Sequence, residues 1–192
     1  MQELKERIRK EGKVLPGSII KVDGFLNHRI DTELMDHIAE EFGKHFNMDE
    51  VTMILTAEAS GIALSAIVAQ HFHKPMIFAK KAKSDNIEGG LYQSDIFSYT
   101  YKKKVTLLVS KEWMSADDKV LIIDDFMANG EAMRGLCDIV EAAGATLVGI
   151  GCAVEKGFQG GGDRLRAAGV NLKSLAIIES AEPGNIVFRD EE

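Results

Sequence analysis

Apolar residues follow two alternating patterns along the chain. Short continuous runs predict buried strands at 51–55, 75–79, 120–124, 145–154 and 174–178. Apolar residues at helical spacing predict helices over about 1–11, 32–46, 61–72 and 131–143. Asp31 suits an N-cap, and Asp163 is placed to cap a further short helix. We expect residues 14–30 and FQGGG to be irregular, and SLAII to be the last strand.

Strands that alternate with helices are typical of βαβ units. The sequence therefore predicts an α/β fold with a mainly parallel sheet flanked by helices. A length of 192 residues suits a single domain, 1–192. One stretch differs, because the polar KKAKSDNIEGG leads into the alternating DIFSYTYKKKVTLLV, with Phe97, Tyr99 and Tyr101 on one face. It predicts a long β-arm at about 81–110, built on a two-stranded ribbon.

Composition and charge exclude several classes of function. A formal net charge of −7 disfavours a nucleic-acid partner, because binding phosphates needs clustered Lys and Arg. Every apolar run is shorter than the roughly 20 residues of a membrane helix, so we expect no membrane partner. Cys137 and Cys152 lie in apolar stretches without CxxC spacing, which indicates buried thiols. We therefore expect a cytoplasmic protein.

Four polar loops, TAEASG, KKAK, DDFMANGEA and VEKGF, follow predicted strands and should meet at one edge of the sheet. In VLIIDDFMANGEAM, two adjacent aspartates come directly after a strand, where we expect them to be partly exposed. The following loop enters a helix, whose first N–H groups favour an anion. A phosphate monoester fits there, with the aspartates as acceptors for ribose hydroxyls. The alternative is an N-cap aspartate beside a solvent-exposed one, which is the commoner reading of two adjacent aspartates. Only the full pattern of strand, acids, Asn-Gly turn and helix favours a phosphate site.

VLIIDDFMANGEAM resembles the phosphoribosyl-pyrophosphate (PRPP) motif of the type I phosphoribosyltransferase family. The resemblance covers almost the whole chain. KVDGFLNHRID, FAKKAKS and VEKGFQGG are similar to the bacterial xanthine phosphoribosyltransferase subgroup. The resemblance implies a small hood at about 1–30, a flexible catalytic loop in the arm at about 81–110, and an activity in purine salvage. PRPP and xanthine, with Mg²⁺ carried on PRPP, would give xanthosine 5′-monophosphate and pyrophosphate through an oxocarbenium-like state.

The same resemblance implies roles for the PRPP-binding residues. Asp124 and Asp125 would bind the ribose hydroxyls and act in catalysis, and Ser60 would bind pyrophosphate with nearby backbone N–H groups. A basic pyrophosphate ligand is expected at Lys81, with Lys80 and Lys83 as alternatives. No protein metal site is expected, because Mg²⁺ takes few carboxylates when phosphates are present. The residues expected to surround the 5′-phosphate are Ala128, Asn129, Gly130, Glu131 and Ala132.

For the purine, the resemblance implies contacts from Ile20, Asn27 and Lys156. Lys156 would bond a purine carbonyl oxygen and so disfavour adenine, and the Asn27 amide suits a 2-oxo purine. Phe158 is as compatible with packing as with stacking on the base, and His28 is more typical of a plain surface residue than of a general base. Some related transferases carry an aspartate in place of Ala128 to manage a purine proton, so the general base stays open.

Two alternatives remain beside xanthine transfer. A PRPP-sensing regulator that binds nucleic acid without catalysis would need a basic face, which the net charge disfavours. A transferase that prefers guanine or hypoxanthine would differ mainly in the hood. In related enzymes the lysine after the second strand can reach a neighbouring subunit, so the resemblance also implies a homodimer.

Overall fold

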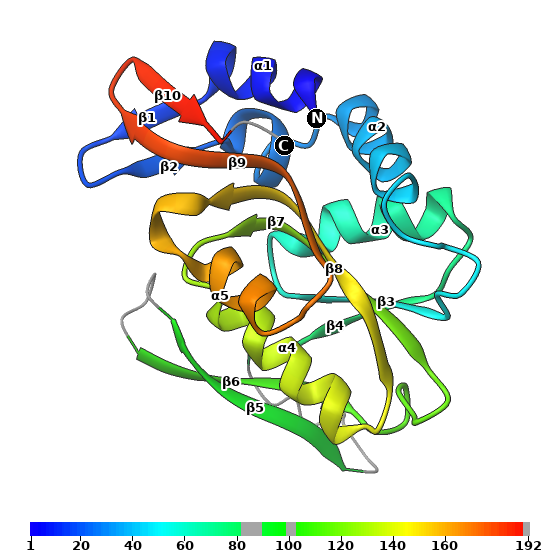
Figure 1. The fold of residues 1–192 in the computed structure, drawn as a ribbon. Coiled ribbons are helices and arrows are strands. Elements are labelled where there is room, and N and C mark those ends of the chain that lie inside the picture. The colour runs from blue at the N-terminus through cyan, green and yellow to red at the C-terminus, as the bar shows by residue number, and fades with distance from the viewer. Residues whose placement is uncertain (82–89, 99–102, 190–192) are drawn as a thin grey trace.

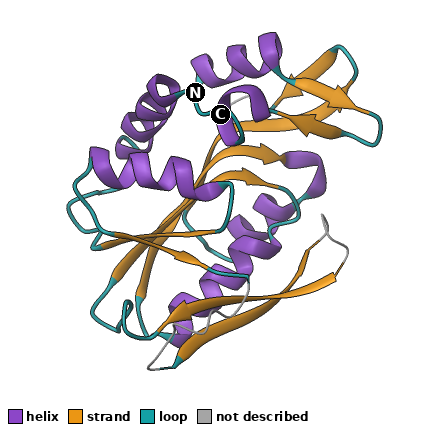
Figure 2. Ribbon diagram, turned by 180° about the vertical axis from the view of Figure 1, so that it is seen from behind, coloured by secondary structure: helices purple, strands orange, loops and turns teal. Residues whose placement is uncertain are grey.

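A computed structural model describes residues 1–81, 90–98 and 103–189. A six-stranded sheet in the order β10-β9-β8-β7-β3-β4 runs through the molecule, with helices on both sides (Figures 1 and 2). Neighbouring strands are parallel, except for the antiparallel pair β9 and β10. The predicted α/β fold with a mainly parallel sheet is confirmed. The strands of this sheet are β3 (Met53–Ala57), β4 (Met76–Ala79), β7 (Lys119–Met127), β8 (Thr146–Lys156), β9 (Leu172–Glu182) and β10 (Asn185–Phe188).

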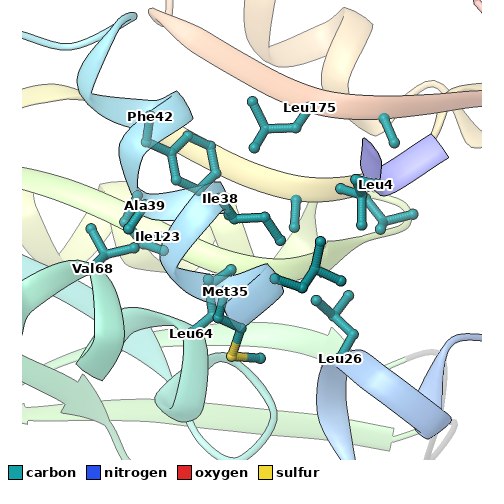
Figure 3. Close-up of a cluster of buried hydrophobic side chains, with 14 of the residues drawn as sticks. Leu4, Leu26, Met35, Ile38, Ala39, Phe42, Leu64, Val68, Ile123 and Leu175 are labelled. Atoms are coloured by element: carbon teal, nitrogen blue, oxygen red, sulfur yellow. The ribbon is translucent and has the colours of Figure 1, made fainter. Parts of the chain in front are cut away.

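The sheet separates two hydrophobic cores. Leu121 and Ile123 belong to one core, and Val120 and Ile122 to the other, because successive side chains of a strand point to opposite faces. The first core also takes the apolar sides of α1 (Gln2–Glu11), α2 (Thr32–Gly43) and α3 (Gly61–His71). Figure 3 shows side chains from these three helices converging with Ile123 and Leu175 of the sheet.

The second core lies under α4 (Glu131–Ala142), α5 (Gly161–Ala167) and the ribbon of β5 (Leu91–Ser98) and β6 (Lys103–Ser110). The ribbon packs along α4, where Gly135 leaves room for Ile96 and Leu107. Hydrogen bonds from Ser94 Oγ to Asp138 (2.7 Å) and from Arg134 Nη2 to the Asp95 carbonyl (2.8 Å) fix it there. The predicted ribbon is confirmed for these strands. Residues 82–89 and 99–102 of the predicted arm, with Tyr99 and Tyr101, lie outside the described residues.

The N-terminal segment is more regular than expected. The prediction that residues 14–30 are irregular is wrong, because β1 (Lys13–Leu15) and β2 (Ile19–Lys21) pair as an antiparallel hairpin. A π-helical turn, Asp23–Asn27, follows. Strands of three residues are too short to show an alternating pattern, so no periodicity predicts them. Asp31 caps α2 as predicted, since its Oδ1 accepts a hydrogen bond from Leu34 N.

Two predictions near the C-terminus also fail. SLAII is part of β9 but does not end the sheet, because a turn at Gly184 (φ 81°) returns the chain into β10. FQGGG is a 3₁₀ turn, Gly157–Gln159, followed by the start of α5. Asp163 lies inside α5 rather than at its cap, and accepts two hydrogen bonds from Arg189 (2.7 and 3.0 Å).

The order of the strands places a crevice beyond one edge of the sheet. Along the chain, β4 follows β3 and pairs with it on one side. The later strand β7 pairs with β3 on the other side. The strand order therefore reverses between β3 and β7, and open α/β sheets bind ligands outside the carboxyl ends of strands at such a point. The carboxyl ends here are Ala57 of β3 and the segment Asp124–Met127 of β7.

Candidate active site

A pocket of about 210 Å³ opens at this point of strand reversal. Its wall includes Ala57, Glu58 and Ser60 after β3, and Lys81 after β4. Asp124 and Phe126 of β7 and the whole loop Ala128–Ala132 complete the opposite side, with Ile96 and Phe97 of the ribbon beside them. Three of the four predicted loops therefore meet in one pocket.

The aspartate pair lies within β7, not after it. The strand continues to Met127, because Phe126 and Met127 pair with Val154 and Glu155 of β8. As a result Asp124 is 7% exposed and Asp125 only 1%. The prediction that these acids are partly exposed is wrong, since the neighbouring strand and the hood cover them.

Asp125 is held by residues from two other segments. Asn27 Nδ2 at the end of the hood's π-helical turn donates to Asp125 Oδ2 (2.8 Å). Ser60 Oγ, just before α3, donates to Asp125 Oδ1 (2.8 Å). A carboxylate offers about four acceptor positions, so Asp125 keeps capacity for a ligand. The structure thus joins Asn27 and Ser60, which were predicted to serve different parts of a substrate, at a single acid.

Burial raises the pKa of the Asp124 carboxyl well above its usual range, and the neighbouring Asp125 charge adds to this shift. The Asp125 N–H donates to Asp124 Oδ1 (3.0 Å), and Lys81 opposes the shift by its positive charge. Gly61 at the start of α3 allows this close packing, because a Cβ there would lie 2.4 Å from Asp124 Oδ1. The site therefore favours a cation or a hydroxyl donor near these carboxyls.

The loop Ala128–Ala132 enters α4 through Gly130, which adopts a left-handed conformation (φ 78°). Glycine reaches this conformation without strain. The first N–H groups of the twelve-residue α4 lack helical partners, so the loop suits an anion. The Glu131 carboxylate is already bonded by Phe97 N and Arg134 Nη2 (both 3.3 Å), which joins the loop to the ribbon.

The segment after β3 also ends at a helix start. Glu58–Ala59, joined by a cis peptide bond, precede Ser60 and α3. Glu58 Oε1 accepts a hydrogen bond from Lys81 N (2.6 Å), which connects this segment to the end of β4. Of the three candidate lysines, Lys81 lines the pocket, while the backbone of Lys80 pairs with Leu108 of the ribbon. Lys83 lies outside the described residues.

The predicted purine residues Ile20, Asn27 and Lys156 are not in the lining of this pocket. Lys156 Nζ donates to the Ser18 carbonyl (3.2 Å) and lies 5.5 Å from the Phe126 ring centre. Partial burial lowers its pKa from the usual value. Ile20 is 8% exposed and packs in the first core. Phe158 is 38% exposed, and the aromatic ring beside Lys156 is Phe126, which the sequence assigned to a loop.

Sequence reasoning missed a buried acid next to Lys156. Glu155 is fully buried, and Arg166 of α5 donates to both of its oxygens (3.1 and 2.7 Å). Ser174 of β9 donates a further hydrogen bond to Glu155 Oε2. The available signal was Glu155 itself, within VEKGF. It ends the long apolar run of β8, and a charge at such a position requires a partner.

Among residues 1–81, 90–98 and 103–189, no three His, Cys, Asp or Glu side chains gather closely enough to hold a metal ion. A Mg²⁺ ion that retains waters and takes one or two carboxylates still fits, because Asp124 lines the pocket and Asp125 lies beside it. In the part of the chain that the structure describes, no helix is long and apolar enough to cross a membrane.

Known proteins resemble this chain along its length. The family model described as "Phosphoribosyl transferase domain" matches residues 25–168. A xanthine phosphoribosyltransferase of Bifidobacterium animalis subsp. lactis is 53% identical over 98% of this chain and 100% of its own. A xanthine phosphoribosyltransferase of Lachnoclostridium phytofermentans is 52% identical, with both chains fully covered.

Among solved structures, adenine phosphoribosyltransferase of Giardia lamblia with 9-deazaadenine superposes with a TM-score of 0.76 at 21% identity, covering 90% of this chain and 96% of its own. The enzyme of Trypanosoma brucei, in complex with AMP, pyrophosphate and ribose-5-phosphate, gives a TM-score of 0.73 at 21% identity, covering 90% and 78%. At this level of identity the two structures support the fold alone.

The raised pKa of Asp124 predicts how an Asp124→Asn variant changes stability with pH. The unfolded carboxyl ionises near pH 4, whereas the folded one ionises at a higher pH. The Asp124 carboxyl therefore stabilises the folded state fully below about pH 4, and this contribution is lost as the pH rises through its pKa in the folded protein. We expect Asp124→Asn to melt at a higher temperature than wild type at pH 8, with the difference shrinking towards pH 4.

Thermal denaturation followed by circular dichroism from pH 4 to 8 measures this difference. Asp49→Asn is the matched control, because Asp49 is exposed on a surface turn. It should shift the melting temperature equally little at every pH. An Asp124→Asn curve that runs parallel to wild type would contradict the assignment.

Proposed function

The chain belongs to the phosphoribosyltransferase family, and we propose that it transfers the 5-phosphoribosyl group of PRPP to N9 of xanthine in the cytoplasm. The products are xanthosine 5′-monophosphate and pyrophosphate, and the reaction serves purine salvage. This proposal rests on sequence identity above 50% to xanthine phosphoribosyltransferases along nearly the whole chain. The free thiols of Cys137 and Cys152 fit a reducing compartment.

The ribose lies over the aspartate pair in this proposal. Asp124 and Asp125 accept hydrogen bonds from the vicinal hydroxyls, and Asn27 and Ser60 hold Asp125 in place for that contact. Positive charge develops on the ribose as pyrophosphate leaves. Two buried carboxyls, preorganised before the reaction, stabilise that charge more strongly than water would. Electrostatic stabilisation of an oxocarbenium-like state is therefore the main contribution of this pair.

The two phosphate ends occupy the two helix starts. The 5′-phosphate binds in the loop Ala128–Ala132, and the pyrophosphate binds the segment from Ser60 into α3, with Lys81 as the basic ligand. Asp124 and Asp125 are the carboxylates that could hold Mg²⁺ together with substrate oxygens. When bound, Mg²⁺ neutralises charge on the departing pyrophosphate. Holding both ends of PRPP fixes C1 of the ribose for attack by the purine.

The purine lies between Phe126 and the hood. Lys156 donates to a purine carbonyl oxygen, Asn27 offers its amide to the 2-position, and the hairpin of Ile20 closes the site. Adenine carries an amino group in place of the 6-oxygen, so Lys156 would face a donor and reject it. Ala128 supplies no carboxylate for the purine proton, so no general base is assigned.

A coupled spectrophotometric or chromatographic assay tests the substrate directly. The purified protein, PRPP and Mg²⁺ are combined in parallel with xanthine, guanine, hypoxanthine and adenine. We expect xanthine to give the highest kcat/KM and adenine none. If guanine or hypoxanthine gives a higher kcat/KM than xanthine, the proposed contacts of the hood with the base are wrong. PRPP binding without turnover of any base would favour the nucleic-acid-binding regulator.

Lys156→Met should weaken the binding of the purine without weakening that of PRPP. Methionine is unbranched like lysine but lacks the ammonium that lies over Phe126, and a hydrogen bond from a charged group contributes about 1.5–3 kcal/mol. We expect KM for xanthine to rise on the order of tenfold or more, with KM for PRPP nearly unchanged in steady-state kinetics. Lys173→Met is the control, because Lys173 lies near the start of the neighbouring strand β9, where it pairs with Gly151 and not with Lys156. An equal rise of both KM values would exclude a purine role for Lys156.

We also propose a homodimer, in which the end of β4 beside Lys81 lies at the contact with a second copy. Lys81 follows β4, which is the edge strand of the sheet, and Phe78 of that strand is 38% exposed. An exposed aromatic on an edge strand suits a protein contact. Analytical ultracentrifugation should give twice the mass of the 21.1 kDa chain. A monomer at assay concentrations would refute this.

A further inference from the structure

We infer that α5 is a positioning element for the loop Ala128–Ala132, and that it acts through Gly161 and Arg164. The inference rests on the proposed function, in which this loop binds the 5′-phosphate of PRPP. Neither residue needs to touch the substrate. Both determine where the backbone N–H groups of the loop point.

Gly161 brings the backbone of α5 into direct contact with the backbone of the loop. A Cβ at Gly161 would lie 2.5 Å from the Ala128 carbonyl oxygen and 2.6 Å from Gly130 N. From the other side, a Cβ at Gly130 would lie 3.3 Å from Gly161 Cα. Backbone atoms cannot rotate away as a flexible side chain can. Any side chain at 161 would therefore displace the loop.

Arg164 fixes the orientation of one peptide group in the loop. Its Nη2 donates to the Asn129 carbonyl (2.9 Å), and its Nη1 donates to the Gln159 carbonyl (3.4 Å). In a planar trans peptide, C=O and N–H point in opposite directions. Holding the Asn129 oxygen towards Arg164 therefore directs the Gly130 N–H away from it. The guanidinium thus presets a donor of the loop before an anion arrives.

The position of α5 is in turn fixed by buried and surface ion pairs. A helix of seven residues has little stability of its own. Arg166 ties α5 to the fully buried Glu155 of β8, and Arg189 ties Asp163 to the end of the chain. Glu155 directly precedes Lys156. One anchor therefore places both the phosphate loop and the proposed purine ligand relative to the sheet.

Arg164→Ala and Gly161→Ala test the inference by different physical changes. The first removes a donor and a charge, and the second displaces the loop without changing any charge. For each, isothermal titration calorimetry of the full chain measures Kd for ribose 5-phosphate and, separately, for pyrophosphate with Mg²⁺. We expect Kd for ribose 5-phosphate to rise about tenfold in each variant, as loss of one well-placed hydrogen bond implies. Kd for pyrophosphate should change less than twofold.

Steady-state kinetics should show the same division. KM for PRPP should rise, while KM for xanthine and kcat at saturating PRPP should stay within about threefold of wild type. Arg9→Ala is the matched control for Arg164, because it removes an exposed guanidinium from α1 and leaves the ion pairs of α5 intact. Gly24→Ala is the control for Gly161, because no atom lies within 4 Å of the added methyl. Both controls should bind ribose 5-phosphate like wild type.

The outcomes separate this inference from the proposed function. Wild type that neither turns over a purine nor binds ribose 5-phosphate overturns both. The role of α5 alone is overturned if wild type is active but the variants bind ribose 5-phosphate normally. It is also overturned if the variants lose affinity for ribose 5-phosphate and pyrophosphate equally. A loss in Arg164→Ala without a loss in Gly161→Ala would mean that the charge acts directly on the phosphate, which also overturns it. Should Arg164→Ala fail to fold, Gly161→Ala and Arg164→Lys decide, since lysine cannot hold both carbonyls.

Discussion

The site depends on the two hydrogen bonds that converge on Asp125. Asn27 comes from the N-terminal hood, Ser60 from the start of α3, and Asp125 from the centre of the sheet. These segments are separated by 98 and 65 positions along the chain. A charge that is 1% exposed requires such partners, because an unpaired buried carboxylate is costly. The same bonds that satisfy the acid therefore bring the three parts of the site together.

Placing two acids side by side in a buried strand conflicts with stability. Burial and the mutual repulsion of Asp124 and Asp125 hold the pKa of Asp124 high, so the folded state is less stable at neutral pH than it would be with a neutral residue. The surrounding fold offsets this with two cores on either side of the sheet. Such a loss of stability is common at functional sites, where charged groups are held in the arrangement that function requires although another arrangement would be more stable.

Much of the fold and the location of the site could be predicted from the sequence. Long periodic segments such as α2 and β8 gave strong patterns, and the polar loops after β3, β4 and β7 met as expected. The three-residue strands β1 and β2 were missed because local pattern cannot identify so short an element. The burial of Asp125 was missed because it depends on Asn27, which lies far away in the sequence. Asp163 was taken for a cap because its partner Arg189 lies 26 positions away in the sequence.

The hairpin of β1 and β2 forms a two-stranded sheet of its own, distinct from the six-stranded one. An insertion or deletion in that hairpin would leave the register of the large sheet unchanged, because register passes through the ladder of paired strands. The β1–β2 hairpin can therefore change in length and sequence while the six-stranded sheet keeps its register. For protein engineering, this makes the hairpin a part of the molecule that can be exchanged without rebuilding the strands that carry Asp124 and Asp125.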